Sequence, residues 1–243
     1  MAKTFRLYTE ETLTENTTIF LNEEQTHYLK NVVKYSPQDI LLCFDNKSGE
    51  YICDIISFTK KTTEVLIKSK TKEYYQTPDI WLLFAPLKKD KTDFVIEKST
   101  ELGVRKIIPT LTRYTITNNI KTERYLAQAI EAAEQSRRTD IPEISSPKTL
   151  NDILSSWDKE RTLYFMDETL QSRPFLEQLQ TSTSQKSAIL IGPEGGFSKE
   201  ELTILRTKPF AQGATLGPRI LRAETAALAS LSCWQMILGD WRN

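Results

Sequence analysis

Histidine and cysteine are scarce in this sequence of 243 residues, and their scarcity excludes several kinds of site. His27 is the single histidine, and Cys43, Cys53 and Cys233 form no C-x-x-C pair. A structural zinc site needs a cluster of such residues, so we expect the protein to bind no metal. A Ser-His-Asp or Cys-His triad would have to use His27 itself. Scattered thiols are typical of proteins from a reducing compartment.

Long hydrophobic segments are also missing. The apolar run Ile80–Leu87 is far shorter than the roughly 20 residues that cross a bilayer. The start of the chain contains no apolar core of the kind found in secretory signals. We therefore expect a cytoplasmic protein without a membrane partner.

Neither sign of charge is in excess, because 32 basic residues balance 32 acidic ones. A polycation that would bind nucleic acid through its whole surface is thereby excluded, and any RNA contact has to come from local basic clusters. With 39% hydrophobic and 26% charged residues, the composition is that of a globular protein. The length allows one large domain or two smaller ones.

The first domain, which we place at residues 1–74, is predicted to consist mainly of short strands. We expect these strands at Ile40–Phe44, at Tyr51–Ile56 and around Val65 and Ile67, which alternate with polar residues. One helix is predicted at 23–33. Antiparallel strands at this spacing indicate a small β-barrel-like domain.

Strands and helices alternate in the second domain, which we place at residues 75–243. Buried strands are predicted at 80–85, 106–109, 162–166 and 188–191, and helices at 93–102, at 123–138 and after the capping box of Ser198 and Glu201. In the second helix, Leu126, Ala129, Ile130 and Ala133 form an apolar face. This alternation predicts a mostly parallel α/β sheet that is covered on both faces.

Glycine is sparse but concentrated, because five of the eight glycines lie between residues 192 and 217. Two segments, 190–198 and 216–225, each run from a strand end through a Gly-Pro loop into a helix. Ligands bind at the carboxyl ends of strands in open parallel sheets. We therefore expect two neighbouring loops that bind a small cofactor. Neither loop has the pattern of a P-loop or of a G-x-G-x-x-G dinucleotide site.

These two loops resemble the paired C-terminal motifs of the bacterial 16S rRNA uridine-N3-methyltransferases, a family of the SPOUT superfamily. The motifs are Ile-Gly-Pro-Glu-Gly-Gly-Phe-Ser at 191–198 and Leu-Gly-Pro-Arg-Ile-Leu-Arg-Ala-Glu-Thr-Ala at 216–226. The resemblance extends to 98–104 and 131–138. The chain departs from the family at Lys34, where arginine is common, and at Tyr114, where a small residue is common.

The resemblance implies a PUA-like β-barrel followed by a SPOUT α/β domain with a C-terminal deep trefoil knot. Periodicity alone predicts an ordinary doubly wound sheet without a knot. The resemblance also implies bound S-adenosylmethionine, a homodimer, and methylation at N3 of a uridine in the decoding region of 16S rRNA in the small ribosomal subunit. The apolar helix that follows Thr225 would then be covered by the core or by the second subunit.

The resemblance supplies the cofactor residues position by position. The catalytic candidates are charged residues near the glycine loops, and the RNA-binding candidates come mainly from short basic clusters. The cofactor residues are expected to be Phe165, Met166, Ile191, Gly192, Gly195, Gly196, Leu216, Gly217, Ile220, Leu221 and Thr225. Arg222 is expected to polarise the uracil carbonyl, with Glu194 or Glu224 as a helper. The RNA-binding residues are expected to be Arg6, His27, Lys34, Lys88, Lys98, Arg137, Arg138 and Arg219.

Two other functions stay open at this stage. The chain could be a catalytically silent RNA-binding factor on the same scaffold, although such a factor need not retain costly glycines in both loops. It could also be an enzyme that uses another adenine nucleotide. Labelling of rRNA and calorimetric binding of the competing nucleotides separate these functions.

Overall fold

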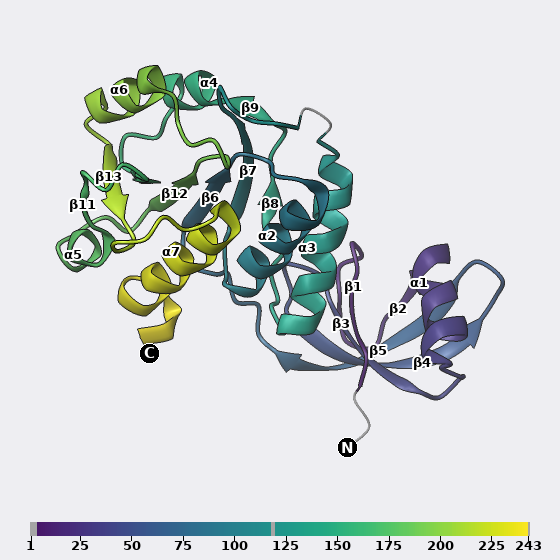
Figure 1. Ribbon diagram of the computed structural model, residues 1–243. Helices are drawn as coiled ribbons and strands as arrows, with labels where there is room; N and C mark the ends of the chain where they lie inside the picture. Colours follow the sequence, from purple (N-terminus) through teal and green to yellow (C-terminus); the bar gives the residue numbers. More distant parts are fainter. Residues whose placement is uncertain (1–3, 118–119, 243) are drawn as a thin grey trace. The chain divides into compact units, whose positions relative to one another are not determined.

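The computed structural model describes residues 4–117 and 120–242 and divides into two compact units. Unit 1 contains the described residues up to Gln76 together with Ala133–Ile141, and unit 2 contains Thr77–Ala132 and the described residues from Pro142 onward (Figure 1). Within the described ranges, no helix has the length and apolar character needed to span a membrane.

Unit 1 is built on a five-stranded sheet with the order β1-β3-β4-β5-β2. The strands are β1 (Arg6–Tyr8), β2 (Thr18–Leu21), β3 (Ile40–Phe44), β4 (Glu50–Phe58) and β5 (Thr63–Lys72). The predicted strands pair antiparallel, as expected, whereas β1, which was not predicted, runs parallel to β3. Alternate residues such as Leu41, Cys53 and Val65 are fully buried and form the core of this unit.

The helix expected at 23–33 has two parts of different geometry. Regular α-helix covers α1 (Glu23–His27), and a π-helix continues from Tyr28 to Val33. Asn22 and Gln25 cap its start reciprocally, and Lys34 ends it in the left-handed region at φ +62°. Hydrophobic periodicity locates a helix, but it does not distinguish the wider π turn.

Unit 2 contains a sheet with the order β11-β13-β10-β12-β6-β7-β8, and β9 also pairs with β7. The strands are β6 (Ile80–Phe84), β7 (Lys106–Leu111), β8 (Glu143–Ile144), β9 (Lys148–Thr149), β10 (Thr162–Met166), β11 (Arg173–Pro174), β12 (Ser187–Ile191) and β13 (Ala211–Thr215). Every pairing between these strands is parallel, which confirms the predicted parallel sheet.

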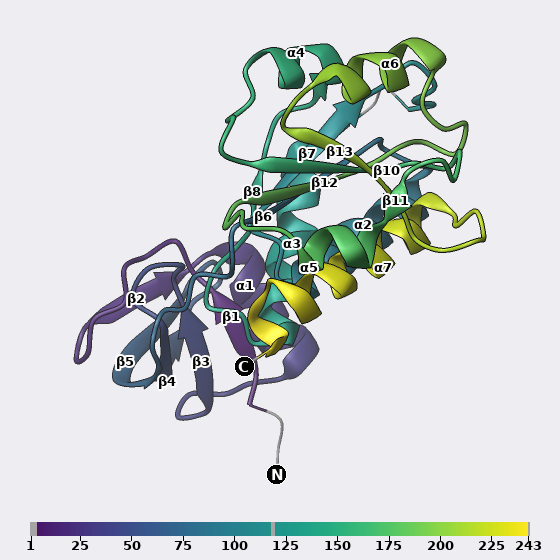
Figure 2. The ribbon, with the colours of Figure 1, turned by 90° about the vertical axis from the view of Figure 1, so that its left-hand side faces the viewer.

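Helices cover both faces of this sheet, as predicted (Figures 1 and 2). The helices are α2 (Lys89–Glu101), α3 (Thr122–Ser136), α4 (Leu150–Ser155), α5 (Phe175–Gln180), α6 (Lys199–Thr207) and α7 (Ala223–Ile237), with a 3-10 turn at Asp240–Arg242. Residues of α2, α3, α5 and α7 pack on one face, and residues of α4 and α6 pack on the other. Strands β6, β7, β10 and β12 contribute alternate side chains to both cores, which explains their continuous apolar runs.

The predicted apolar face of α3 is partly wrong. Leu126 is 40% exposed, whereas Tyr125, Ala129 and Ala132 are buried. The observed face is rotated toward Tyr125, whose ring joins the core of unit 2. Two adjacent large apolar residues make the sequence pattern ambiguous at this turn.

Strand β13 lies between β10 and β11, although these two strands are consecutive in the chain. The connection from Asp167 to Ser172 therefore crosses β13. It stays close to that strand, because the Asp167 amide donates to the Ala214 carbonyl over 2.8 Å. Gly213 is required beneath it, since a Cβ there would collide with the Ser172 hydroxyl.

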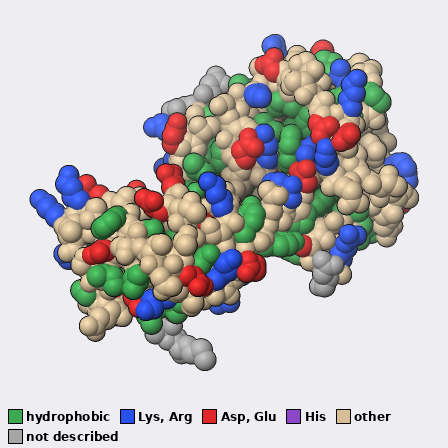
Figure 3. All heavy atoms as spheres, turned by 180° about the vertical axis from the view of Figure 1, so that it is seen from behind, with side chains coloured by type: hydrophobic (Ala, Val, Ile, Leu, Met, Phe, Trp, Pro, Cys, Tyr) green, Lys and Arg blue, Asp and Glu red, His purple; other side chains and the backbone are tan. Residues whose placement is uncertain are grey.

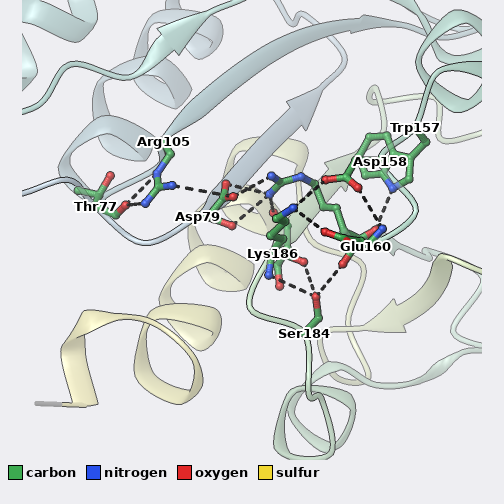
Figure 4. Close-up of polar contacts among 10 residues, drawn as sticks. Thr77, Asp79, Arg105, Trp157, Asp158, Glu160, Ser184 and Lys186 are labelled. Atoms are coloured by element: carbon green, nitrogen blue, oxygen red, sulfur yellow. Dashed lines mark hydrogen bonds and ion pairs between the residues drawn. The ribbon is translucent and has the colours of Figure 1, made fainter.

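A network of ion pairs and hydrogen bonds, which we name the Arg161 network, occupies the amino ends of the strands. Its members are Arg161 and the residues Thr77, Asp79, Arg105, Asp158, Glu160, Ser184 and Lys186, which are labelled in Figure 4. The two terminal nitrogens of Arg161 each donate to one Asp79 oxygen over 2.9 Å. The Arg161 guanidinium also lies 3.6 Å from the centre of the Trp81 ring.

Candidate active site

Three strand ends converge on one cavity at the opposite edge of the sheet. This strand-end cavity has a volume of about 220 Å³, far more than one ordered water needs. It is lined by residues of β10 and its loop (Met166, Asp167, Glu168, Leu170), by residues of β12 and its loop (Ile191, Gly192, Pro193, Glu194, Gly196, Phe197) and by residues from β13 to α7 (Ala214, Leu216, Arg219, Ile220, Leu221, Arg222, Ala223, Ala226). The two glycine loops were expected at neighbouring strands, but β10 lies between them.

The loop after β12 is a tight turn that enters a capped helix. The Gly196 amide donates to the Pro193 carbonyl over 2.9 Å, and Gly196 has a φ of +72°. This φ favours glycine, and a Cβ at Gly196 would also displace the Glu168 carboxylate. The predicted capping box is confirmed, with the Ser198 amide donating to Glu201 over 2.8 Å.

The loop after β13 turns at Gly217, which has a φ of +101°. Arg222 is the N-cap residue of α7, and its carbonyl accepts from the Ala226 amide over 2.8 Å. Arg219 and Arg222 are both exposed and both line the cavity. Ile220 also lines it, although the residue is 74% exposed.

A third loop, after β10, was not included in the sequence-based site beyond Met166. Asp167 is buried and accepts hydrogen bonds from Thr169, Ser172 and Arg206. Burial alone would raise the pKa of Asp167, but these hydrogen bonds outweigh it and lower the pKa. Partial burial, assisted by the charge of Asp167, raises the pKa of Glu168. The signal in the sequence was an Asp-Glu pair directly after a buried strand.

One lysine joins the acidic residues of the two glycine loops. Lys91 Nζ lies 3.6 Å from Glu194 Oε1 and 3.4 Å from Glu224 Oε1. Glu194 lines the cavity, whereas Glu224 does not. Glu224 Oε2 is buried and has no hydrogen-bond partner within the described ranges.

Seven of the expected cofactor residues line the cavity, and four do not. The seven are Met166, Ile191, Gly192, Gly196, Leu216, Ile220 and Leu221. Phe165 is instead buried against Phe197 in the core. A Cβ placed on Gly195 would lie 3.3 Å from Tyr114, which is not part of the cavity lining. Gly217 forms the turn after β13 but does not line the cavity, and Thr225 is exposed on α7.

Arg6 and Arg138 do not fit their predicted role as RNA contacts. Both are buried within unit 1, at 6% and 8% exposure. Arg6 pairs with Glu50, donates to the carbonyls of Ala133 and Arg138, and lies 3.9 Å from the Phe44 ring centre. Arg138 pairs with Asp140 over 3.0 Å. The structure assigns both arginines to internal packing, because both are buried and paired with carboxylates of unit 1.

The other predicted RNA contacts lie at the surface. His27, Lys34, Lys88, Arg137 and Arg219 are exposed. Lys98 is engaged by two carboxylates, and hydrogen bonds to Glu101 and Glu97 raise its pKa. Figure 3 shows basic and acidic side chains interspersed over the face that it displays. Among the described positions, no group of three His, Cys, Asp or Glu residues could hold a metal ion.

Residues 75–235 match the family model of an RNA methyltransferase domain, and residues 21–68 match that of an RNA methyltransferase PUA domain. The chain belongs to this RNA methyltransferase family. A ribosomal RNA small subunit methyltransferase E from Rickettsia conorii is 32% identical over 228 residues, which cover 93% of each chain. The protein of the same name from Bacillus subtilis is 29% identical and covers 96% of this chain and 95% of its own.

Solved structures of family members have the same fold. A methyltransferase from Legionella pneumophila in complex with S-adenosylmethionine is 29% identical, with a TM-score of 0.89 over 98% of this chain and 100% of its own. The ribosomal RNA small subunit methyltransferase E from Neisseria gonorrhoeae, bound to S-adenosylmethionine, is 28% identical, with a TM-score of 0.86 and the same coverage.

Proposed function

We propose that this protein transfers a methyl group from S-adenosylmethionine to N3 of a uridine in the decoding region of 16S rRNA, within the small ribosomal subunit. The observation that carries the proposal is the strand-end cavity, where loops after three parallel strands combine apolar walls with arginine and glutamate side chains. Relatives named for small-subunit rRNA methylation, and solved structures that hold the cofactor, support the same function.

The residues of the cavity fit this cofactor chemically. Adenine needs apolar surfaces, which Met166, Leu216 and Leu221 supply. The charged amino-acid end of the cofactor needs partners of both signs, which Glu168 and Arg219 can provide. Glycine at 192 and 196 keeps side chains out of the loop where the backbone would contact the ligand.

The chemistry requires removal of a proton from the base. When bound, S-adenosylmethionine supplies an electrophilic methyl group on a positively charged sulfur. Uridine N3 carries a proton and cannot attack until that proton is lost. We assign proton acceptance to Glu194, since it lines the cavity and Glu224 does not. The Arg222 guanidinium would stabilise the negative charge that develops on the uracil carbonyl oxygens.

Further features belong to the same proposal. The matched PUA domain would bind RNA as a β-barrel, with exposed Lys34 and His27 among its contacts. A deep trefoil knot is supported by the connection that crosses β13. We also propose a homodimer, which would cover the exposed Met236 of α7, and a cytoplasmic location.

Labelling of ribosomal subunits tests the proposal. The protein is incubated with radiolabelled S-adenosylmethionine and small subunits that lack the modification, and the rRNA is digested and analysed by mass spectrometry. We expect one 3-methyluridine per subunit. Normal subunit binding without label would instead favour a silent RNA-binding factor. Tighter calorimetric binding of another adenine nucleotide than of S-adenosylhomocysteine would favour a different enzyme.

A further inference from the structure

Lys91 occupies a position that helix formation does not explain. It lies in the first turn of α2, where the helix dipole disfavours a positive charge, and Lys88 and Lys89 add to the same charge. Its side chain is 32% exposed, so it is accessible from the solvent side. The two carboxylates within 4.0 Å of Nζ come from other segments, Glu194 from the loop after β12 and Glu224 from the first turn of α7. A locally unfavourable residue of this kind is expected where function requires it.

The Glu194 carboxylate depends on Lys91 for its position. Glu194 is at the tip of the turn that the Gly196–Pro193 hydrogen bond closes, and this bond fixes the backbone but not the side chain. Among the described residues, Lys91 is the one cation within ion-pair distance of Glu194. Without it, the side chain could adopt several rotamers.

Glu224 in turn holds Lys91. Its side chain is 17% exposed, against 30% for Glu194, and one of its oxygens is buried without a hydrogen-bond partner in the described part of the chain. A buried carboxylate requires a compensating charge, and Lys91 supplies it. The three side chains are therefore connected in sequence: Glu224 holds Lys91, and Lys91 orients Glu194.

We propose that Lys91 is a positioning residue for methyl transfer, which holds the Glu194 carboxylate at the cavity wall to receive the proton of the target base. The inference rests on the proposed function. The N3–H bond breaks and its proton forms an O–H bond on Glu194. The electron pair at N3 forms the new bond to the methyl carbon, while the carbon–sulfur pair remains on sulfur and leaves S-adenosylhomocysteine.

The test compares Lys91→Met with Lys91→Arg, which keeps the charge, and with Lys159→Met as a matched control. Lys159 is exposed before β10, at the opposite edge of the sheet, and has no ion pair among the described residues. We expect Lys91→Met to lower the single-turnover rate on small subunits by about 100-fold, the usual contribution of a positioned proton acceptor. The affinities for S-adenosylmethionine and for subunits should stay within about threefold, a kcat effect rather than a KM effect. Lys91→Arg should recover most of the rate, and Lys159→Met should match the unmodified protein.

A second readout does not depend on activity. Crystal structures of the cofactor-free Lys91→Met and Lys91→Arg variants should show the Glu194 carboxylate displaced in the first and retained in the second. A Lys91→Met rate equal to that of the control, or an unmoved Glu194, overturns the inference. A loss of cofactor affinity or thermal stability that accounts for the whole rate loss also overturns it. If the unmodified protein labels no rRNA, the proposed function fails, while the crystal comparison still tests whether Lys91 holds Glu194.

Discussion

The parallel sheet in unit 2 has an amino edge, where its strands begin, and a carboxyl edge, where they end. The two are built from the same strands but differ in chemistry. At the amino edge, Arg161 is 3% exposed and makes paired hydrogen bonds with Asp79. At the carboxyl edge, Gly196 and Gly217 adopt positive φ angles, while Arg219 and Arg222 are exposed around a cavity. Arg161 at the first edge is buried and paired with Asp79, whereas the two arginines at the second are exposed around the cavity. The comparison indicates that residues at the amino ends of the strands stabilise the fold, whereas residues at the carboxyl ends are arranged for binding.

The largest effect is expected from Gly196→Val at the carboxyl edge. A branched side chain at φ +72° would overlap the Glu168 carboxylate and force the loop into another conformation. Restoring the binding conformation would cost about 3 kcal/mol, or about 100-fold in affinity for S-adenosylhomocysteine by calorimetry. Gly195→Ala is the matched control, because the new Cβ would contact Tyr114 outside the cavity lining. The affinity of this variant for S-adenosylhomocysteine should stay within about threefold of that of the unmodified protein. Equal binding by both variants would remove the structural distinction between the two glycines.

Arg161→Met tests the amino edge. Removing the Arg161 guanidinium leaves the Asp79 carboxylate without its main partner. We expect this change to lower the free energy of unfolding by about 3 kcal/mol in urea titrations. Arg105→Met should cost less, because Arg105 is 31% exposed and lies 3.9 Å from Asp79. Cofactor affinity well below the unfolding temperature should be unchanged. An affinity loss as large as that of Gly196→Val would show that the two edges are not separate.

Asp167→Asn examines a fully satisfied charge at the binding edge. Hydrogen bonds that lower the pKa of Asp167 stabilise its ionised form in the folded state. Their stabilisation is present above the ordinary pKa of aspartate and is lost as the pH falls through the lowered value. We expect the variant to lose about 2 kcal/mol of unfolding free energy at neutral pH, and the difference from the unmodified protein to narrow in acid. A constant difference down to strongly acidic pH would contradict this account.

The smallest effect is expected from Glu168→Gln. The pKa of Glu168 is raised, so the folded state binds a proton more tightly than the unfolded chain. The unmodified protein therefore loses stability as the pH rises from the ordinary glutamate pKa to the raised value. The variant should lack this slope and should melt at a temperature higher by no more than about 2 °C at neutral pH, measured by calorimetry. A lower melting temperature would show that the ionised carboxylate is instead stabilised.

Local patterns were sufficient to predict much of the fold. Continuous apolar runs located the main strands of unit 2, since strands buried on both faces have no polar positions. For β13, only a strand end before Leu216 was predicted and not the extent of the strand, because its sequence Ala-Gln-Gly-Ala-Thr contains no such run. Its place between β10 and β11 depends on long-range pairing, to which no local pattern corresponds.

The site was predictable where backbone geometry dictates the residue. Gly192 and Gly196 stood out because glycine is rare elsewhere in the chain. Charged residues were harder to assign, since the same arginine can bind RNA or pair internally. Arg6 does the latter with Glu50, 44 positions away in the sequence, and only the tertiary structure reveals that partner.

The placement of β13 also bears on synthesis of the protein. Translation delivers Ala211–Thr215 after every other strand of the sheet, yet this segment fills a gap between two earlier ones. A nascent chain that is interrupted before this segment would expose an open edge of β10 and would lack one wall of the cavity. The strand-end cavity is therefore complete only after the last part of the polypeptide has been synthesised.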